Sequence, residues 1–265
     1  MRLLDTITHK LKSFHGDPPP YAILSHRWRE NEVTFQDLQT SDPSSLEGYD
    51  KITKTCSISA AAGLEYAWID SCCIDKTNST ELSEAINSMY RWYQEATICY
   101  AYLADVSNTV RIASSFLEGE ALEDLTEEYL WRSEWFARGW TLQELIAPSV
   151  VIFLDRDWDE VGTKLSLRRS VSRITGIPES ILEGTDVESA SVAQRMSWAA
   201  GRTTTNVEDE AYCLMGLFGV HMPLLYGEGV NAFFPPTRRD IEGLDRLQLV
   251  PWQGVGRHRA AERHA

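Results

Sequence analysis

Four short apolar runs, separated by segments long enough for a helix, constrain the fold of this chain most strongly. The runs span residues 21–25, 66–70, 98–103 and 149–154. Each is rich in β-branched or aromatic side chains and is bounded by polar residues, which is typical of a strand buried on both faces. Such strands alternating with helices predict an α/β fold with a parallel, doubly wound sheet flanked by helices.

Helices are expected between these strands, at residues 52–65, 80–96 and 135–146. The second has the clearest pattern, because its apolar residues recur at spacings of three and four, as on one buried helix face. These residues are Leu82, Ala85, Ile86, Met89, Tyr90 and Tyr93. Pro148 predicts the end of the third helix, because the residue before a proline disfavours helical backbone.

The pattern changes after residue 154, where three further helices are expected, at residues 165–174, 191–200 and 208–218. They predict a helical C-terminal cap packed on the sheet. The predicted organisation is therefore an α/β core over residues 1–155, a helical cap over 156–229, and a poorly ordered or atypical tail over 230–265.

Charge and cysteine usage exclude several classes of protein. The formal net charge is −14, and so acidic a surface repels nucleic acid and anionic membranes. No apolar run approaches the ~18 residues that a membrane span requires, and the start of the chain does not resemble a signal peptide. The five cysteines, two of them adjacent, form neither a disulfide framework nor a metal-ligand pattern. The sequence predicts a cytoplasmic protein with reduced thiols and no bound metal.

The acidic segment over residues 116–134 has a plain explanation. It contains seven acidic residues and one basic residue, Arg132. Such a run is usually a solvated face, so a loop or an exposed helix face is expected there.

Several segments, in order along the chain, resemble the heterokaryon-incompatibility (HET) domain of filamentous fungi. They include Tyr21-Ala-Ile-Leu-Ser-His-Arg-Trp28, Tyr66-Ala-Trp-Ile-Asp-Ser-Cys-Cys-Ile-Asp-Lys76, Arg138-Gly-Trp-Thr-Leu-Gln-Glu-Leu-Ile-Ala-Pro148, Asp209-Glu-Ala-Tyr-Cys-Leu-Met-Gly-Leu217 and Tyr226-Gly-Glu-Gly229. The resemblance ends near residue 230, after which the expected continuation is not apparent. It implies an effector of programmed cell death in non-self recognition. It also implies protein partners, either further copies in a homo-oligomer or an NLR-type sensor.

The HET family is remotely similar to TIR domains, which have a flavodoxin-like sheet. A TIR helix carries a Trp-Cys-x-x-Glu pattern, and its Glu is catalytic in the members that cleave NAD. Trp140-Thr-Leu-Gln-Glu144 is similar to this pattern, with Thr141 in place of the cysteine. It also follows the third predicted strand, as the TIR helix does. The similarity implies that Glu144 is catalytic, that NAD is a substrate, and that no cofactor is required.

Other polar side chains are expected near Glu144, because ligands of open parallel sheets bind beyond the carboxyl ends of the strands. The candidates for substrate binding are Ser25, His26, Arg27, Asp70 and Trp140. Arg27 or His26 is expected to contact a pyrophosphate, and Trp140 or Trp28 to stack on a ring. A carboxylate beside the ribose would stabilise the positive charge that develops during glycosidic cleavage.

Alternative interpretations remain open at this point. Glu144 is equally interpretable as a surface acid paired with a base, although Arg138, six residues away, would not share its helix face. His26 is also interpretable as a hydrogen-bonded structural histidine. A second function class is a non-enzymatic signalling module that acts by self-association and partner recruitment. A conventional nucleotide-binding protein has little support, because no glycine-rich phosphate loop follows a strand.

Overall fold

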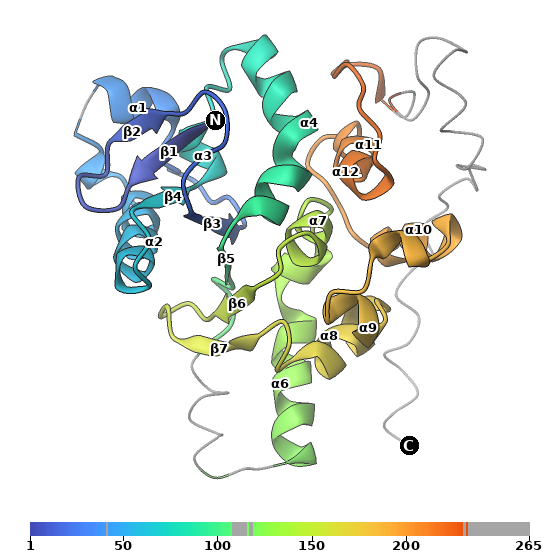
Figure 1. The fold of residues 1–265 in the computed structure, drawn as a ribbon. Helices are drawn as coiled ribbons and strands as arrows, with labels where there is room; N and C mark the ends of the chain where they lie inside the picture. The colour runs from blue at the N-terminus through green and yellow to red at the C-terminus, as the bar shows by residue number, and fades with distance from the viewer. Residues whose placement is uncertain (41, 108–115, 117–118, 230–231, 233–265) are drawn as a thin grey trace.

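The computed structural model describes residues 1–40, 42–107, 116, 119–229 and 232 (Figure 1). Apart from Ala232, the predicted tail over residues 230–265 therefore lies outside the described residues. The chain forms one mixed seven-stranded sheet with the order β2-β1-β4-β3-β5-β6-β7. The strands are β1 (Arg2–Asp5), β2 (Leu11–Ser13), β3 (Tyr21–His26), β4 (Tyr66–Trp68), β5 (Ile98–Tyr102), β6 (Val151–Leu154) and β7 (Glu160–Thr163).

The four central strands are the four apolar runs of the sequence. β4, β3, β5 and β6 are mutually parallel, and in chain order they lie 2-1-3-4, as in flavodoxin-like sheets. The α/β prediction is confirmed. The sheet is nevertheless mixed, because β1, β2 and β7 add antiparallel edges. These strands have three or four residues and little apolar alternation, so no local pattern predicts them.

The longer helices flank the sheet on both faces. They are α2 (Tyr49–Ala61), α4 (Ser79–Glu95), α6 (Glu120–Arg132), α7 (Thr141–Ile146), α8 (Arg168–Thr175) and α10 (Val192–Ala199). In β5, the Tyr100 hydroxyl donates to a carbonyl of α2, whereas the neighbouring Cys99 thiol faces the Glu144 carbonyl of α7. Successive strand residues point to opposite faces, so α2 and α7 cover opposite faces of the sheet.

Shorter elements connect and complete these layers. They are α1 (Phe35–Thr40), α3 (Asp70–Cys73), α9 (Glu179–Leu182), α11 (Asp209–Tyr212) and α12 (Met215–Phe218), with 3-10 turns η1 (Pro43–Ser45), η2 (Glu134–Ala137) and η3 (Val187–Ser189). The predicted helix at 208–218 is thus two short helices. The segments after β7 are mainly helical, and they lie to one side of the sheet, with α8 against α6 and α12 against α4 (Figure 1).

The predicted helix at 135–146 is also broken in two. The chain leaves η2 at Arg138 and starts α7 only at Thr141, because the backbone in between pairs with a distant segment. The Gly139 amide donates to the Thr203 carbonyl at 2.8 Å, and the Thr203 amide donates to the Ala137 carbonyl at 2.7 Å. A Cβ atom on Gly139 would lie 2.6 Å from the Thr204 methyl group, so the two segments approach too closely for a larger residue.

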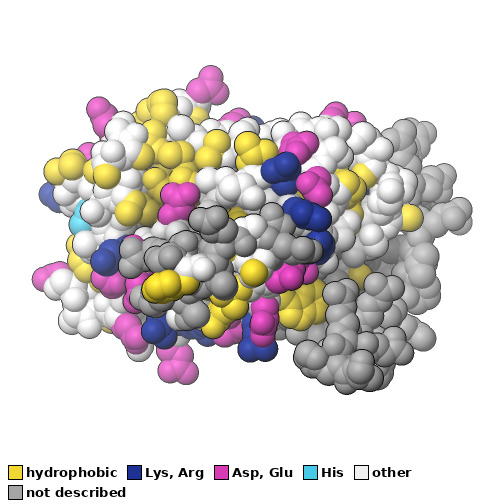
Figure 2. Space-filling model, turned by 90° about the horizontal axis from the view of Figure 1, so that it is seen from below, with side chains coloured by type: hydrophobic (Ala, Val, Ile, Leu, Met, Phe, Trp, Pro, Cys, Tyr) yellow, Lys and Arg dark blue, Asp and Glu magenta, His cyan; other side chains and the backbone are white. Residues whose placement is uncertain are grey.

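The acidic segment forms α6, and the prediction of a solvated helix face is confirmed for its described side chains. Glu128 is exposed and pairs with Arg132 at 2.6 Å on the same helix, and Glu127 pairs with Arg173 at 3.0 Å. Seen from below, acidic side chains are scattered among basic and apolar ones (Figure 2). In the described part of the chain, no helix is long and apolar enough to cross a membrane.

Candidate functional site

A cavity of about 550 Å³ lies at the carboxyl ends of the parallel strands. His26 ends β3, Asp70 follows β4, and Glu144 comes from α7. Another wall comes from the C-terminal segments, through residues that include Asp209 and Tyr226. This is the position at which doubly wound sheets bind ligands, and the volume is within the range of small-molecule sites.

Glu144 is a buried carboxyl group of this cavity, with only 7% of its surface exposed. The Ser25 hydroxyl donates to its Oε2 atom, and the Trp135 indole N–H donates to the Ser25 oxygen at 2.8 Å. The two hydrogen bonds, from Trp135 to Ser25 and from Ser25 to Glu144, orient the carboxyl group from its buried side. The alternative of a surface acid therefore does not hold.

Burial raises the pKa of Glu144 to about 7, although the hydrogen bond from Ser25 and the charge of Arg138 act in the opposite direction. A carboxyl group with this pKa can hold or release a proton near neutral pH. Perturbed carboxyl groups in cavities are typical of functional sites.

Ser25 is expected to control this titration. Replacing Ser25 with alanine removes a hydrogen bond that lowers the pKa of Glu144 and leaves the buried Trp135 N–H without its acceptor. We expect the pKa of Glu144 to rise further, by roughly one pH unit. The carbon-13 shift of the Glu144 carboxyl group, followed against pH, measures it. Ser166→Ala, at an exposed turn, is the control, and a lower or unchanged pKa in Ser25→Ala would contradict the expectation.

His26 lies between two carboxylates. Its Nε2 atom is 3.6 Å from Glu32 and its Nδ1 atom is 3.8 Å from Asp70. Burial opposes ionisation of Glu32, but His26 and Lys51 outweigh it and lower the pKa of Glu32 to about 2. Neither ring nitrogen of His26 has a hydrogen-bond partner among the described residues, although the residue is only 4% exposed. This buried imidazole lines the cavity with its hydrogen-bonding capacity unused.

Asp70 lies between His26 and two further lining residues, Trp28 and Lys76. Its carboxylate accepts from the Trp28 indole N–H at 2.9 Å and lies 3.8 Å from the Lys76 ammonium group. The Lys76 nitrogen sits over the Trp28 ring, 3.2 Å from its centroid. An aromatic face and a cation therefore meet beside Asp70.

The structure brings most of the predicted site residues together. His26, Asp70, Trp140 and Glu144 all line the cavity. Ser25 is fully buried and contacts Glu144 from behind instead of lining the cavity.

Arg27 lies elsewhere. Its side chain is exposed and forms an ion pair with Glu134, which also pairs with Arg29 at 3.2 Å. Arg27 is therefore not among the lining residues, and the cavity receives its positive charge from Lys76 and Arg138.

The Tyr226-Gly-Glu-Gly229 segment has a structural role at the cavity wall. The Tyr226 hydroxyl donates to Asp209 at 2.9 Å. The Glu208 carboxylate accepts the amides of Gly227 at 2.7 Å and Gly229 at 3.0 Å, and these contacts lower its pKa. The sequence identified this segment only as part of the resemblance to the HET domain. No local pattern predicts its contact with Asp209.

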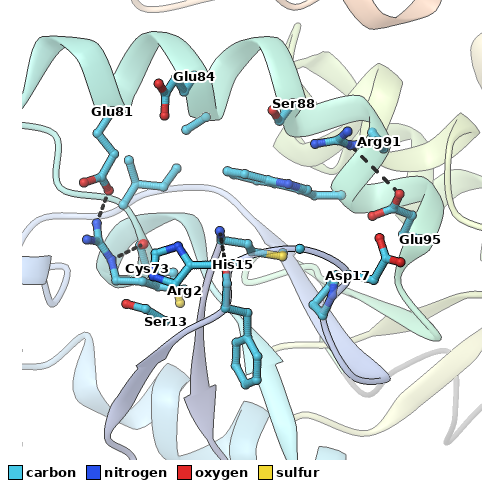
Figure 3. A pocket seen from close by; sticks show the side chains of 17 residues that line it. Arg2, Ser13, His15, Asp17, Cys73, Glu81, Glu84, Ser88, Arg91 and Glu95 are labelled. Carbon is cyan, nitrogen blue, oxygen red and sulfur yellow. Dashed lines mark hydrogen bonds and ion pairs between the residues drawn. The ribbon is translucent and has the colours of Figure 1, made fainter.

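A second cavity, of about 540 Å³, lies between the β1–β2 hairpin and α4 (Figure 3). Its charged residues pair largely with one another: Arg2 with Glu81, and Arg91 with Glu95 at 3.9 Å. None of the predicted site residues lines it. The described residues contain no cluster of side chains suited to a metal ion, and all five cysteines are buried free thiols.

Comparison with known proteins identifies the family of this chain. Residues 21–144 match the model of the family described as heterokaryon incompatibility protein (HET). The chain contains a HET domain. Over 231 residues it is 47% identical to vegetative incompatibility protein HET-E-1 of Podospora anserina, an alignment that covers 85% of this chain and 16% of that protein. No solved structure matches the chain.

The matched region includes every site residue predicted from the sequence. It starts at Tyr21, the first residue of β3, and ends at Glu144 itself. The HET domain thus supplies the strand ends and the buried carboxyl group, while the wall formed by Asp209 and Tyr226 lies beyond the match.

Proposed function

We propose that this chain is an effector of fungal heterokaryon incompatibility whose HET domain hydrolyses NAD. The observation that carries the proposal is Glu144, a buried carboxyl group with a pKa raised to about 7, held at the cavity by Ser25. The HET domain and the similarity to a vegetative incompatibility protein support the biological role. The similarity of Trp140-Thr-Leu-Gln-Glu144 to the TIR pattern supports the reaction.

In the proposed reaction, water replaces nicotinamide at the anomeric carbon of the ribose. The bond between that carbon and the pyridinium nitrogen breaks, and its electron pair neutralises the nitrogen. Water forms the new C–O bond and releases one proton. The ionised Glu144 carboxylate would hold the ribose hydroxyls and stabilise the oxocarbenium-like charge, which a buried carboxylate does more strongly than an exposed one.

The proposal includes a protein partner and a location. Activation would occur in the cytoplasm, either by assembly of several copies of the chain or through an NLR-type sensor. The one-sixth share of HET-E-1 that the chain covers agrees with a domain that acts together with other domains. A non-enzymatic module that acts by self-association and recruitment is the competing function, and the same experiment separates the two.

The test compares the wild-type protein with Glu144→Gln, which keeps the size of the side chain and removes its charge. Purified proteins are incubated with NAD, and cells expressing each at matched levels are assayed for NAD content and death. We expect the wild type to release nicotinamide and the variant to lose at least about a hundredfold in rate. Glu128→Gln, at an exposed position of α6, is the matched control.

Two results would overturn the enzyme proposal. One is killing by both proteins while NAD stays constant, which would establish the recruiting module. The other is equal NAD cleavage by the wild type and Glu144→Gln, which would place the chemistry on other residues.

A further inference from the structure

Two cationic side chains face the cavity of Glu144, in a chain whose net charge is −14. Arg138 comes from the break between η2 and α7 and is half-buried. Its guanidinium group has no hydrogen bond to protein and no carboxylate within 4.0 Å in the part of the chain that the structure describes. Arginines in such surroundings usually have partners, so this group is free to bind a ligand.

Lys76 is the second cation, and it lines the same cavity as Arg138. Its side chain is 29% exposed and 3.8 Å from Asp70. Burial lowers the pKa of Lys76, and the charge of Arg138 lowers it further. Two cations that repel each other in a partly desolvated cavity are stabilised when an anion binds between them.

We propose that Arg138 and Lys76 form a phosphate-binding subsite in this cavity. The identification of the bound molecule as a nucleotide rests on the proposed function. The sequence assigns the contact with a pyrophosphate to Arg27 or His26. Arg27 pairs with Glu134 outside the cavity, and we assign its part of this contact to Arg138. A planar guanidinium group binds two phosphate oxygens at once, whereas Lys76 contributes a point charge.

The subsite also determines where the rest of a nucleotide lies. Arg138 and Glu144 line the same cavity, so we place the ribose that adjoins a phosphate on Arg138 at the Glu144 carboxyl group. The Trp28 ring, which carries the Lys76 nitrogen on one face, is 38% exposed and lines the same cavity, and we assign it to an aromatic base. Arg138 is accordingly a binding and positioning residue that touches the phosphate, and Glu144 remains the group at the ribose.

Calorimetric titration of the full chain tests the subsite without requiring turnover. The probes are ADP-ribose, adenosine and inorganic pyrophosphate. We expect the wild type to bind ADP-ribose at least tenfold more tightly than adenosine, and only the binding of the phosphate-containing probes to weaken with added salt. Arg138→Gln and Lys76→Met should each lose most of this preference, whereas Arg138→Lys should retain part of it. Arg132→Gln, on the exposed face of α6, should behave as the wild type.

Folding of the variants is checked by circular dichroism. Arg138 makes its structural hydrogen bonds through its backbone carbonyl, so the side-chain changes leave those bonds in place. An Arg138→Gln variant that binds ADP-ribose as tightly as the wild type, or a loss confined to Arg27→Gln, overturns the subsite. Failure of the wild type to prefer ADP-ribose or to bind pyrophosphate overturns it too.

The outcomes also separate this inference from the proposed reaction. Binding of pyrophosphate that depends on Arg138, without NAD cleavage that depends on Glu144, supports the subsite and rejects the enzyme. Cleavage that depends on Glu144, with the same KM for NAD in the wild type and Arg138→Gln, supports the enzyme and rejects the subsite.

Discussion

Above pH 7, the Glu144→Gln variant is expected to be more stable than the wild-type protein by up to roughly 3 kcal/mol, and near pH 4.5 this advantage should vanish. The ordinary pKa of a glutamate is 4.5, and burial raises that of Glu144 to about 7. Between these values, the folded protein keeps a proton that the unfolded chain releases. The stability of the wild type therefore falls as the pH rises through this window, whereas glutamine contributes no such dependence.

Urea unfolding of both proteins at pH 5 and pH 8 measures the effect. Other titrating groups cancel in the difference between the two proteins. Glu128→Gln, at an exposed position, should follow the wild type at both pH values. If the free energies of unfolding of the wild type and Glu144→Gln differ by the same amount at pH 5 and pH 8, the pKa of Glu144 is not raised by folding. If the expectation holds, the charged carboxylate is maintained at the cavity at the expense of stability, which is common at functional sites.

Gly216→Ala is expected to destabilise the protein by roughly 3 kcal/mol or more. Gly216 lies on α12, and a Cβ atom there would be 2.1 Å from the Cβ of Tyr90 on α4 and 2.6 Å from its Cγ. A rotation about χ1 does not move Cβ, so the two helices would have to separate. Alanine otherwise favours a helix over glycine, and the expected loss therefore measures the close packing of α12 on α4.

Gly219→Ala is the control, because it lies at the end of the same helix. Its φ of +65° strains an alanine, but a Cβ atom there meets nothing within 4 Å. We expect that change to cost about 1 kcal/mol. Thermal and urea unfolding of the two variants provide the comparison. Equal losses would show that α12 does not approach α4 as closely as the structure indicates.

Local patterns were sufficient to predict the centre of the fold. The buried strand β3 begins with four consecutive apolar residues, and α4 repeats its apolar side chains at helical spacing, so both were predicted to within a few residues. The edge strand β7 contains Glu160, Gly162 and Thr163 around one valine, and it exists because it can pair with β6. Its short sequence has no β pattern of its own.

The site was predicted in part for a similar reason. His26 and Asp70 follow from the rule that strand ends meet at one edge of a sheet, whereas Glu144 was singled out by its similarity to the TIR pattern. Arg138 was expected within a continuous helix, where its spacing turns it away from Glu144. The actual break at Gly139 comes from pairing with Thr203, far along the chain. The ion pair that holds Arg27 outside the cavity joins it to Glu134, another distant contact without a local signal.

The cavity wall determines how long a segment must be to carry the complete cavity into another protein. The matched HET region ends at Glu144, yet Asp209 and Tyr226 close the same cavity from beyond it. A protein shortened to the matched region would lose this wall together with β6, β7 and the end of α7, so it would not keep the cavity around Glu144. The unit that natural selection can transplant into a new architecture is therefore longer than the recognisable family segment. Substitutions in the wall that contains Asp209 and Tyr226 can change which ligand the cavity binds, while the residues at the strand ends stay the same.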